Sequence, residues 1–159
     1  MADMLELIKQ HLAAYSTANW ATYRAAFAAD VVYEEMATRQ RVQGVTAYLD
    51  AVQRWKRAFP DLQATLLTAV VSGDEAAVEV AWEGTHMGPF DGPLGAIAPT
   101  HQRGRVTSLI VLRVADGKIV ELRHYFDLLT VLGQLGVVPM MGPARPAGSS
   151  DAAASQSRH

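Results

Sequence analysis

The first sixty residues carry apolar side chains at the three- and four-residue spacing of amphipathic helices. This spacing predicts helices over residues 3–17, 20–28 and 45–59. The apolar stripes of the three helices are Met4, Leu5, Ile8, Leu12 and Tyr15; Trp20, Tyr23 and Phe27; and Tyr48, Val52, Trp55 and Phe59. Between the second and third helices, residues 30–37 favour a strand.

The pattern changes to that of strands after Asp61. Residues 62–72 and 75–86 are predicted to pair through a tight turn at Gly73-Asp74, and residues 105–115 form the next strand. On the second of these strands, one face carries Val78, Val80, Trp82 and His86.

The strongest hairpin signal is Asp116-Gly117, since a type I′ turn needs positive φ at both central residues. The strand that follows leads into a short helix over residues 128–135, which Asp127 is placed to cap and Gly136 to end. In a regular strand, side chains alternate between the two faces of the sheet. One face of this strand is therefore predicted to carry Val120, Leu122, His124 and Phe126. The other face is predicted to carry Ile119, Glu121, Arg123, Tyr125 and Asp127.

A long loop is predicted over residues 84–104, because glycine and proline gather there: Gly84, Gly88, Pro89, Gly92, Pro93, Gly95, Pro99 and Gly104. Loops of this length inside a compact domain are usually functional or mobile. We therefore expect it at the mouth of a pocket.

Helices first and an antiparallel meander after them indicate an α+β fold, with helices packed on one face of a curved sheet. We expect one domain over residues 1–140. The Ala-, Gly-, Ser- and Pro-rich residues 141–159 are expected to be a disordered tail.

The composition is ordinary for a globular protein of 159 residues, with 50% hydrophobic and 19% charged residues. The net charge of −2 gives no reason to expect nucleic acid or an anionic membrane as a partner. The absence of cysteine excludes disulfides, thiolate catalysis and cysteine–zinc sites. The N-terminus is acidic and amphipathic, and no stretch approaches the roughly 20 apolar residues that span a bilayer. We expect a cytoplasmic protein.

Four motifs stand in order along the chain: Pro60-Asp61-Leu62, Gly84-Thr85-His86-Met87-Gly88-Pro89-Phe90, Asp116-Gly117-Lys118-Ile119-Val120-Glu121, and Asp127 followed by Gln134-Leu135-Gly136. With them the chain resembles the SnoaL-like polyketide cyclases, or ester cyclases, of the NTF2-like superfamily, from residue 3 to about 139. The resemblance implies a cone-shaped barrel: a strongly curved, mostly antiparallel sheet wrapped by three N-terminal helices around one deep apolar pocket. It also implies a homodimer or higher homo-oligomer and no cofactor.

In the cyclases of that family, an aspartate three residues before the helix-capping Asp is the general acid/base of an intramolecular aldol closure. The resemblance places His124 at that position and makes Asp127 the capping residue. A second family histidine, on the strand before the Asp-Gly turn, falls on or near Ile110.

The candidate catalytic residues are His124, Asp127 and His86. Burial of His124 in an apolar cavity would lower its pKa and keep the ring neutral, so that it can act as a base near neutral pH. Each candidate has a structural alternative: His124 packs at a strand end, Asp127 only caps its helix, and His86 anchors the loop. Asp127 can pair with His124 only if a twist of the chain or the turn of the following helix brings it back to the same face.

Aromatic and aliphatic side chains at helical or strand spacing are the candidates for binding a hydrophobic substrate. They are Tyr15, Tyr33, Tyr48, Trp55, Trp82, Phe90, Ile110, Leu112, Leu122 and Phe126.

Other polar residues are expected to be solvated. Glu34 and Glu35 alternate faces, so at most one points inward, and an exposed pair at a sheet edge is expected. We also expect solvent exposure for His101 in the loop and for a group of basic residues, Arg39, Arg41, Arg54, Lys56 and Arg57. The histidines have no close-paired spacing, so no metal site is predicted.

Two classes of function remain open. The first is a cofactor-free enzyme in which His124, supported by Asp127, shuttles a proton on a polyketide- or terpenoid-like molecule, by aldol-type cyclisation, isomerisation, or epoxide or lactone opening. The second is a binding protein that holds a hydrophobic molecule without converting it. The outer sheet face is only weakly polar, since it carries Thr65, Leu67, Ala77, Ala81 and Thr107, and this predicts a homodimer formed by sheet-to-sheet contact.

Overall fold

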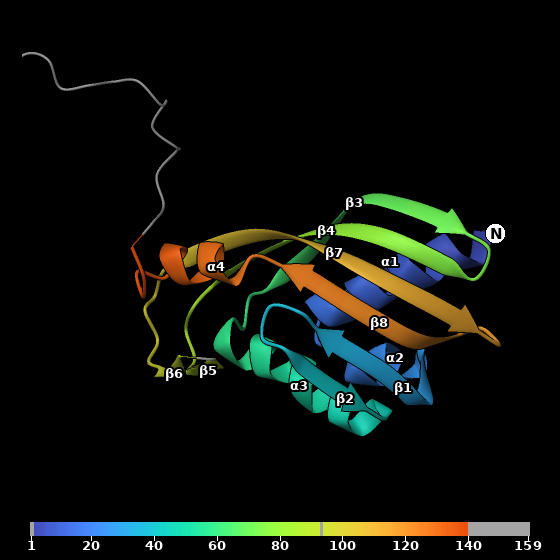
Figure 1. The fold of residues 1–159 in the computed structure, drawn as a ribbon, viewed down its shortest axis with the longest axis horizontal. Helices are drawn as coiled ribbons and strands as arrows, with labels where there is room; N and C mark the ends of the chain where they lie inside the picture. The colour runs from blue at the N-terminus through green and yellow to red at the C-terminus, as the bar shows by residue number, and fades with distance from the viewer. Residues whose placement is uncertain (1, 93, 140–159) are drawn as a thin grey trace, which may run out of the picture.

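The computed structural model describes residues 2–92 and 94–139 (Figure 1). The predicted tail over residues 141–159 lies outside the described residues, and the domain boundary near residue 140 remains a prediction. No helix of the described residues is long and apolar enough to cross a membrane.

Three N-terminal helices form as predicted, and a fourth follows the last strand. Their bounds are α1 Ala2–Ser16, α2 Trp20–Ala25, α3 Val45–Ala58 and α4 Leu128–Gln134. The second helix is shorter than predicted because the chain already enters a strand at Phe27. Asn19 caps α2 by accepting a hydrogen bond from the Thr22 amide.

A six-stranded sheet forms the other layer, in the order β2-β1-β8-β7-β4-β3. Its strands are β1 Phe27–Glu35, β2 Gln40–Gln43, β3 Gln63–Ser72, β4 Glu75–Thr85, β7 Arg103–Ala115 and β8 Lys118–Phe126. Every neighbouring pair is antiparallel except β1 and β8, which run parallel. The α+β class and the curved, mostly antiparallel sheet are confirmed (Figure 1), but the sheet stays open, with β2 and β3 at its edges.

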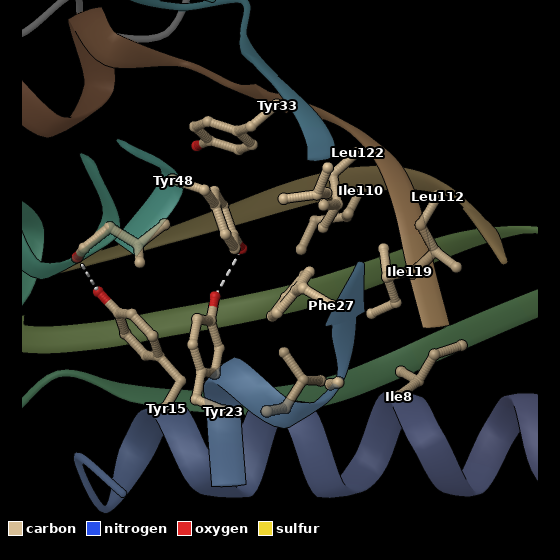
Figure 2. Packing of buried hydrophobic residues seen from close by; sticks show 14 of the residues in the cluster. Ile8, Tyr15, Tyr23, Phe27, Tyr33, Tyr48, Ile110, Leu112, Ile119 and Leu122 are labelled. Carbon is tan, nitrogen blue, oxygen red and sulfur yellow. Dashed lines mark hydrogen bonds between the residues drawn. The ribbon is translucent and has the colours of Figure 1, made fainter. Parts of the chain in front are cut away.

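The main core lies between the three N-terminal helices and one face of this sheet. Side chains of α1, such as Ile8 and Leu12, belong to the same buried cluster as Tyr48 of α3 and the inward residues of β7 and β8. Figure 2 shows Ile8 on α1 below, with Ile110, Leu112, Ile119 and Leu122 of the sheet above it.

The hairpin between β7 and β8 turns at Asp116-Gly117, where both φ angles are positive (49° and 72°), as the sequence predicted. The side chains of β8 do not alternate strictly between the two faces of the sheet. Ile119 pairs with Val114 whereas Glu121 pairs with Arg113, so β8 has one extra residue at this point. Because of this bulge, Ile119 and Leu122 are both buried and Val120 is not in the core. The placement of Val120 and Ile119 was therefore wrong.

The predicted loop over residues 84–104 is shorter and more ordered than expected. The strands β4 and β7 extend into it, and it contains a small hairpin of β5 Phe90–Gly92 and β6 Gly95–Ile97. This hairpin packs on the end of α3, where the ring centroids of Phe90 and Trp55 lie 4.6 Å apart. A Cβ added at Gly88 would lie 2.1 Å from the Arg57 carbonyl oxygen, so this close approach requires glycine.

The prediction that the basic residues around α3 are all solvated was wrong for Lys56. Its side chain is buried, and Nζ donates hydrogen bonds to the carbonyl oxygens of Ser16 (3.0 Å) and Leu62 (2.6 Å). These carbonyls compensate the charge at the end of α3, so Lys56 joins three segments of chain instead of facing water.

Candidate active site

A cavity lies between the helices and the inner face of the sheet. Most of its wall is aromatic or aliphatic, and most of the predicted substrate-binding residues line it: Tyr15, Tyr33, Tyr48, Trp55, Trp82, Ile110, Leu122 and Phe126. Phe90 and Leu112 do not: both are buried, Phe90 behind Trp55 and Leu112 in the main core. The predicted loop reaches the cavity with its first and last residues, Gly84 and Gly104, which both line the wall.

The tyrosines of the wall are fixed by hydrogen bonds. Tyr15 donates to the Val52 carbonyl (3.0 Å), and the hydroxyls of Tyr23 and Tyr48 lie 2.6 Å apart. Figure 2 shows Tyr15 and Tyr23 side by side, with Tyr48 opposite Tyr23 and Tyr33 beyond it. Such a wall can hold a flat, ring-containing molecule.

His124 of β8 lines this cavity, directly across the strand pair from Ile110. Its Nδ1 lies 3.2 Å from the Tyr33 hydroxyl oxygen, and its Nε2 is buried with no hydrogen-bond partner in the part of the chain that the structure describes. Burial lowers the pKa of His124 to about 4, although the negative charge of Glu35 acts in the opposite direction. The ring is therefore neutral near pH 7.

Glu35 is the buried acid behind Tyr33, and it was missed: the prediction of an exposed Glu34–Glu35 pair was wrong for this residue. Glu35 is 1% exposed, and its Oε2 accepts hydrogen bonds from the Tyr33 hydroxyl and from Trp55 Nε1, both at 2.9 Å. Its Oε1 accepts from the Thr38 hydroxyl at 2.5 Å. The signal was present in the sequence: Glu35 continues the alternation of Val31 and Tyr33, which are both buried.

These contacts decide which nitrogen of His124 carries the proton. A carboxylate only accepts, so the Tyr33 proton points to Glu35, and the Tyr33 oxygen is left to accept a hydrogen bond. It accepts from Nδ1–H of His124, and in the neutral ring this leaves a lone pair on Nε2. Glu35, Tyr33 and His124 thus form a relay that ends in an unpaired base.

Asp127 lies elsewhere. It caps α4, accepting hydrogen bonds from the Leu129 amide (3.0 Å) and from the amide (3.2 Å) and hydroxyl (2.6 Å) of Thr130. These hydrogen bonds lower the pKa of Asp127. The side chain is outside the cavity, beside a shallow hollow on the outer sheet face with Leu109 and Tyr125. The twist that direct pairing with His124 would need is not present.

His86 is also outside the cavity. It is fully buried at the base of the loop, where its Nδ1 lies 3.0 Å from the Thr100 hydroxyl and accepts from the Thr100 amide (3.2 Å). Its ring packs on Phe59, which lines the cavity, with centroids 5.2 Å apart. Burial lowers the pKa of His86. Its contacts are those of a loop anchor.

His11 of α1 is a cavity residue that the sequence analysis did not identify. It is 5% exposed, and its ring stacks on Tyr23 with centroids 4.6 Å apart. None of the described residues offers its Nδ1 a hydrogen-bond partner. Burial, followed by the charge of His124, lowers the pKa of His11 to about 3. Its position three residues after Ile8 and four before Tyr15 could have indicated that it lies on the buried helix face.

Among residues 2–92 and 94–139, no three His, Cys, Asp or Glu side chains come together as a metal site.

A family model described as SnoaL-like polyketide cyclase matches residues 5–135. The chain belongs to this family. IdmH of Streptomyces antibioticus, described as a candidate polyketide cyclase, is 30% identical with a TM-score of 0.71, over 83% of this chain and 97% of that one. TsrD of Streptomyces laurentii is 26% identical with a TM-score of 0.74, over 86% and 97%. AclR of Streptomyces galilaeus, described as a candidate hydroxylase, is 25% identical with a TM-score of 0.77, over 89% and 86%. No curated protein sequence matches the chain.

Membership of the SnoaL-like family supports an enzyme of the cyclase type acting on a small molecule. The similar proteins are described by different activities, AclR as a candidate hydroxylase and IdmH as a candidate polyketide cyclase. The chemistry of this member therefore has to be argued from its own site.

Proposed function

We propose that this SnoaL-like protein is a cofactor-free enzyme that transfers protons on a hydrophobic, ring-containing carbonyl compound of the polyketide or terpenoid type, with Nε2 of His124 as the base. The observation that carries this proposal is the pairing state of the ring. Nδ1 is hydrogen-bonded to Tyr33, which itself donates to Glu35, while Nε2 is buried and has no partner among the described residues, in a ring that lines the cavity.

The reaction that fits best is an aldol-type cyclisation. Nε2 of His124 takes a proton from the carbon beside a carbonyl group, and the resulting enolate carbon attacks a second carbonyl carbon of the same molecule, forming a C–C bond. The imidazolium then returns its proton to the new alkoxide oxygen, so no proton or electron is gained or lost. Isomerisation uses the same first step with the proton returned to another carbon.

The low pKa of His124 limits the substrate. A base whose pKa is about 4 is weak, so the proton that it removes has to be an acidic one. A carbon flanked by two carbonyl groups, or by a carbonyl and an aromatic ring, meets this requirement.

The other two predicted catalytic residues act indirectly in this proposal. Asp127 holds the start of α4, whose Val131 and Gln134 line the cavity. His86 holds the loop against α3 through Thr100 and Phe59.

The weakness of the base is also the observation that favours the second candidate, a binding protein for a hydrophobic small molecule. The two are separated with 2-tetralone, a bicyclic aromatic ketone with an acidic carbon between its carbonyl and its ring. Binding is followed by quenching of tryptophan fluorescence, since Trp55 and Trp82 line the cavity. Catalysis is followed by NMR as exchange of the acidic protons in D₂O.

An enzyme exchanges these protons above the buffer rate, and His124→Phe loses about 10²–10⁴-fold, the usual contribution of a general base. His101→Asn is the matched control, because it removes an imidazole outside the cavity at a left-handed position that Asn tolerates. Binding without exchange in the wild-type protein would reject the enzyme and support the binding protein.

A further inference from the structure

We propose that His11 is a second substrate-contacting residue, which donates a hydrogen bond from Nδ1–H to the carbonyl oxygen of the ring ketone whose neighbouring proton His124 removes. This inference rests on the proposed function and deepens it, since it makes a ketone the substrate class.

Two imidazoles reach this cavity from opposite layers, one buried (His11) and one half-buried (His124). His11 comes from α1 in the helical layer and His124 from β8 in the sheet, and both line the wall. Each ring has one buried nitrogen that finds no hydrogen-bond partner among residues 2–92 and 94–139, Nδ1 in His11 and Nε2 in His124. The cavity lies between the two rings, and in this proposal a ligand bound in it offers one polar group to each of these nitrogens.

Packing alone does not explain a histidine at position 11. The ring stacks on Tyr23 at an interplanar angle of 22° and meets Phe27 edge-on, with centroids 5.1 Å apart. A phenylalanine would make the same ring contacts without burying an unpaired polar atom. What histidine adds at this position is the polar edge, and leaving a buried polar atom unpaired destabilises the fold.

His11 is suited to donate rather than to act as a second base. Burial keeps it neutral, and any positive charge gained by His124 disfavours protonation of His11 further. A neutral imidazole still carries one N–H, and such a donor can polarise a carbonyl group without giving up its proton. The two rings therefore have different roles, His124 taking the proton and His11 holding the oxygen.

The step balances with no other reactant. Nε2 of His124 takes the proton, the C–H electrons form a C=C bond, and the carbonyl π electrons move onto the oxygen. The hydrogen bond from His11 strengthens as this oxygen becomes an enolate, which is how a donor of this kind lowers the barrier.

The contact is tested by infrared spectroscopy of 2-tetralone labelled with ¹³C at the carbonyl and bound to the full chain. In the wild-type protein the carbonyl band should lie below its position in an apolar solvent, because a hydrogen bond weakens the C=O bond. His11→Phe should return the band to the apolar position, whereas His124→Phe should leave it shifted. His11→Gln, which keeps an N–H donor, should keep part of the shift.

Proton exchange gives the second readout. His11→Phe should lower the exchange rate by about 10²-fold, the effect of removing one oxyanion donor, while His101→Asn leaves it unchanged. Should His11→Phe fail to fold, His11→Leu, which also lacks a donor, replaces it in both measurements.

The outcomes separate the two proposals. A band shift that depends on His11, in a protein that does not exchange the protons, supports the contact and rejects catalysis. Exchange that needs His124 but is unchanged in His11→Phe, with an unshifted band, overturns the role of His11 and leaves the base in place. If His11→Phe weakens binding of 2-naphthol, a hydroxyl donor, but not of 2-tetralone, His11 accepts instead of donating and the proposal is wrong.

Discussion

The hydroxyl oxygen of Tyr33 lies 3.2 Å from Nδ1 of His124 while its proton is directed at Glu35, so one tyrosine connects a buried acid with the candidate base. The two ends of this relay are neighbours in the sheet, since Glu35 of β1 is the Cα partner of His124 on the parallel strand β8. The geometry of the base is therefore set by strand register as well as by hydrogen bonds.

Tyr33→Phe should reduce exchange of 2-tetralone by about 10-fold or more, because it removes the acceptor that holds the proton on Nδ1. Most of the loss should appear in turnover rather than in affinity. Tyr48→Phe is the matched control, since Tyr48 lines the same cavity but bonds to Tyr23 instead of to His124. Equal losses in the two variants would contradict the relay.

Glu35→Gln should lower the pKa of His124 further, because the negative charge of Glu35 raises it in the wild-type protein. The change is measured by NMR titration of the imidazole protons. A higher pKa for His124 in Glu35→Gln would show that the carboxylate does not act on this ring.

Acid should destabilise the fold through its buried histidines. Both rings have depressed pKa values in the folded state, about 4 for His124 and about 3 for His11, against about 6.5 when unfolded. Above pH 6.5 both histidines are neutral in the folded and in the unfolded protein, so they cause no loss of stability. Below it the unfolded chain binds protons that the folded chain does not, so stability falls until the folded pKa is reached. From pH 6.5 to 5 this is about 2 kcal/mol for His11.

Urea unfolding of the wild-type protein and His11→Phe at pH 7 and pH 5 measures this loss. The variant should lose less stability between the two pH values, because it has one buried imidazole fewer. The same pH dependence in both proteins would mean that His11 is not neutral and buried in solution.

Asp127→Asn should keep both the melting temperature and the exchange rate, since Asn is nearly as good a helix cap as Asp. Asp127→Ala should lower the melting temperature, because the amides at the start of α4 lose their acceptor. A large loss of exchange in Asp127→Asn, with its melting temperature unchanged, would return this carboxylate to the mechanism.

The homodimer remains a prediction, and the outer sheet face provides the surface for it. Leu109 and Tyr125 are cross-strand partners, 42% and 38% exposed, beside the hollow that Thr107 also lines. Ala81, which was predicted to lie on the outer sheet face, is buried between its register partners Thr65 and Thr107. Light scattering at micromolar concentration should show a dimer that Leu109→Glu converts to a monomer. A monomeric wild-type protein would reject the prediction.

Local pattern predicted the parts of the fold that depend on local rules. The Asp116-Gly117 turn follows from backbone preference, and the cap at Asp127 follows from side-chain chemistry. The inward position of His124 was also correct, because alternation holds from Leu122 onwards.

The features that the sequence did not predict depend on contacts between segments that are far apart in the chain. The bulge that buries both Ile119 and Leu122 depends on register with β7, which no single strand encodes. Glu35 was predicted to lie at an exposed edge because the residues that bury it are distant in sequence. Trp55 of α3 donates a hydrogen bond to it, and β8 pairs with its strand β1. His11 was passed over because a polar residue on an apolar helix face is identified only when the facing wall is known.

The position of β8 between β1 and β7 has a consequence for how the protein is made. The strands β1 and β2 are synthesised well before β8, which is the strand that joins them to the rest of the sheet. Pairing so distant in sequence is slow to form. The cavity and its relay can therefore assemble only after β8 has been synthesised, and any chain released before Lys118 lacks the strand that carries His124. Loss of β8 would remove both the base and the connection between the two halves of the sheet.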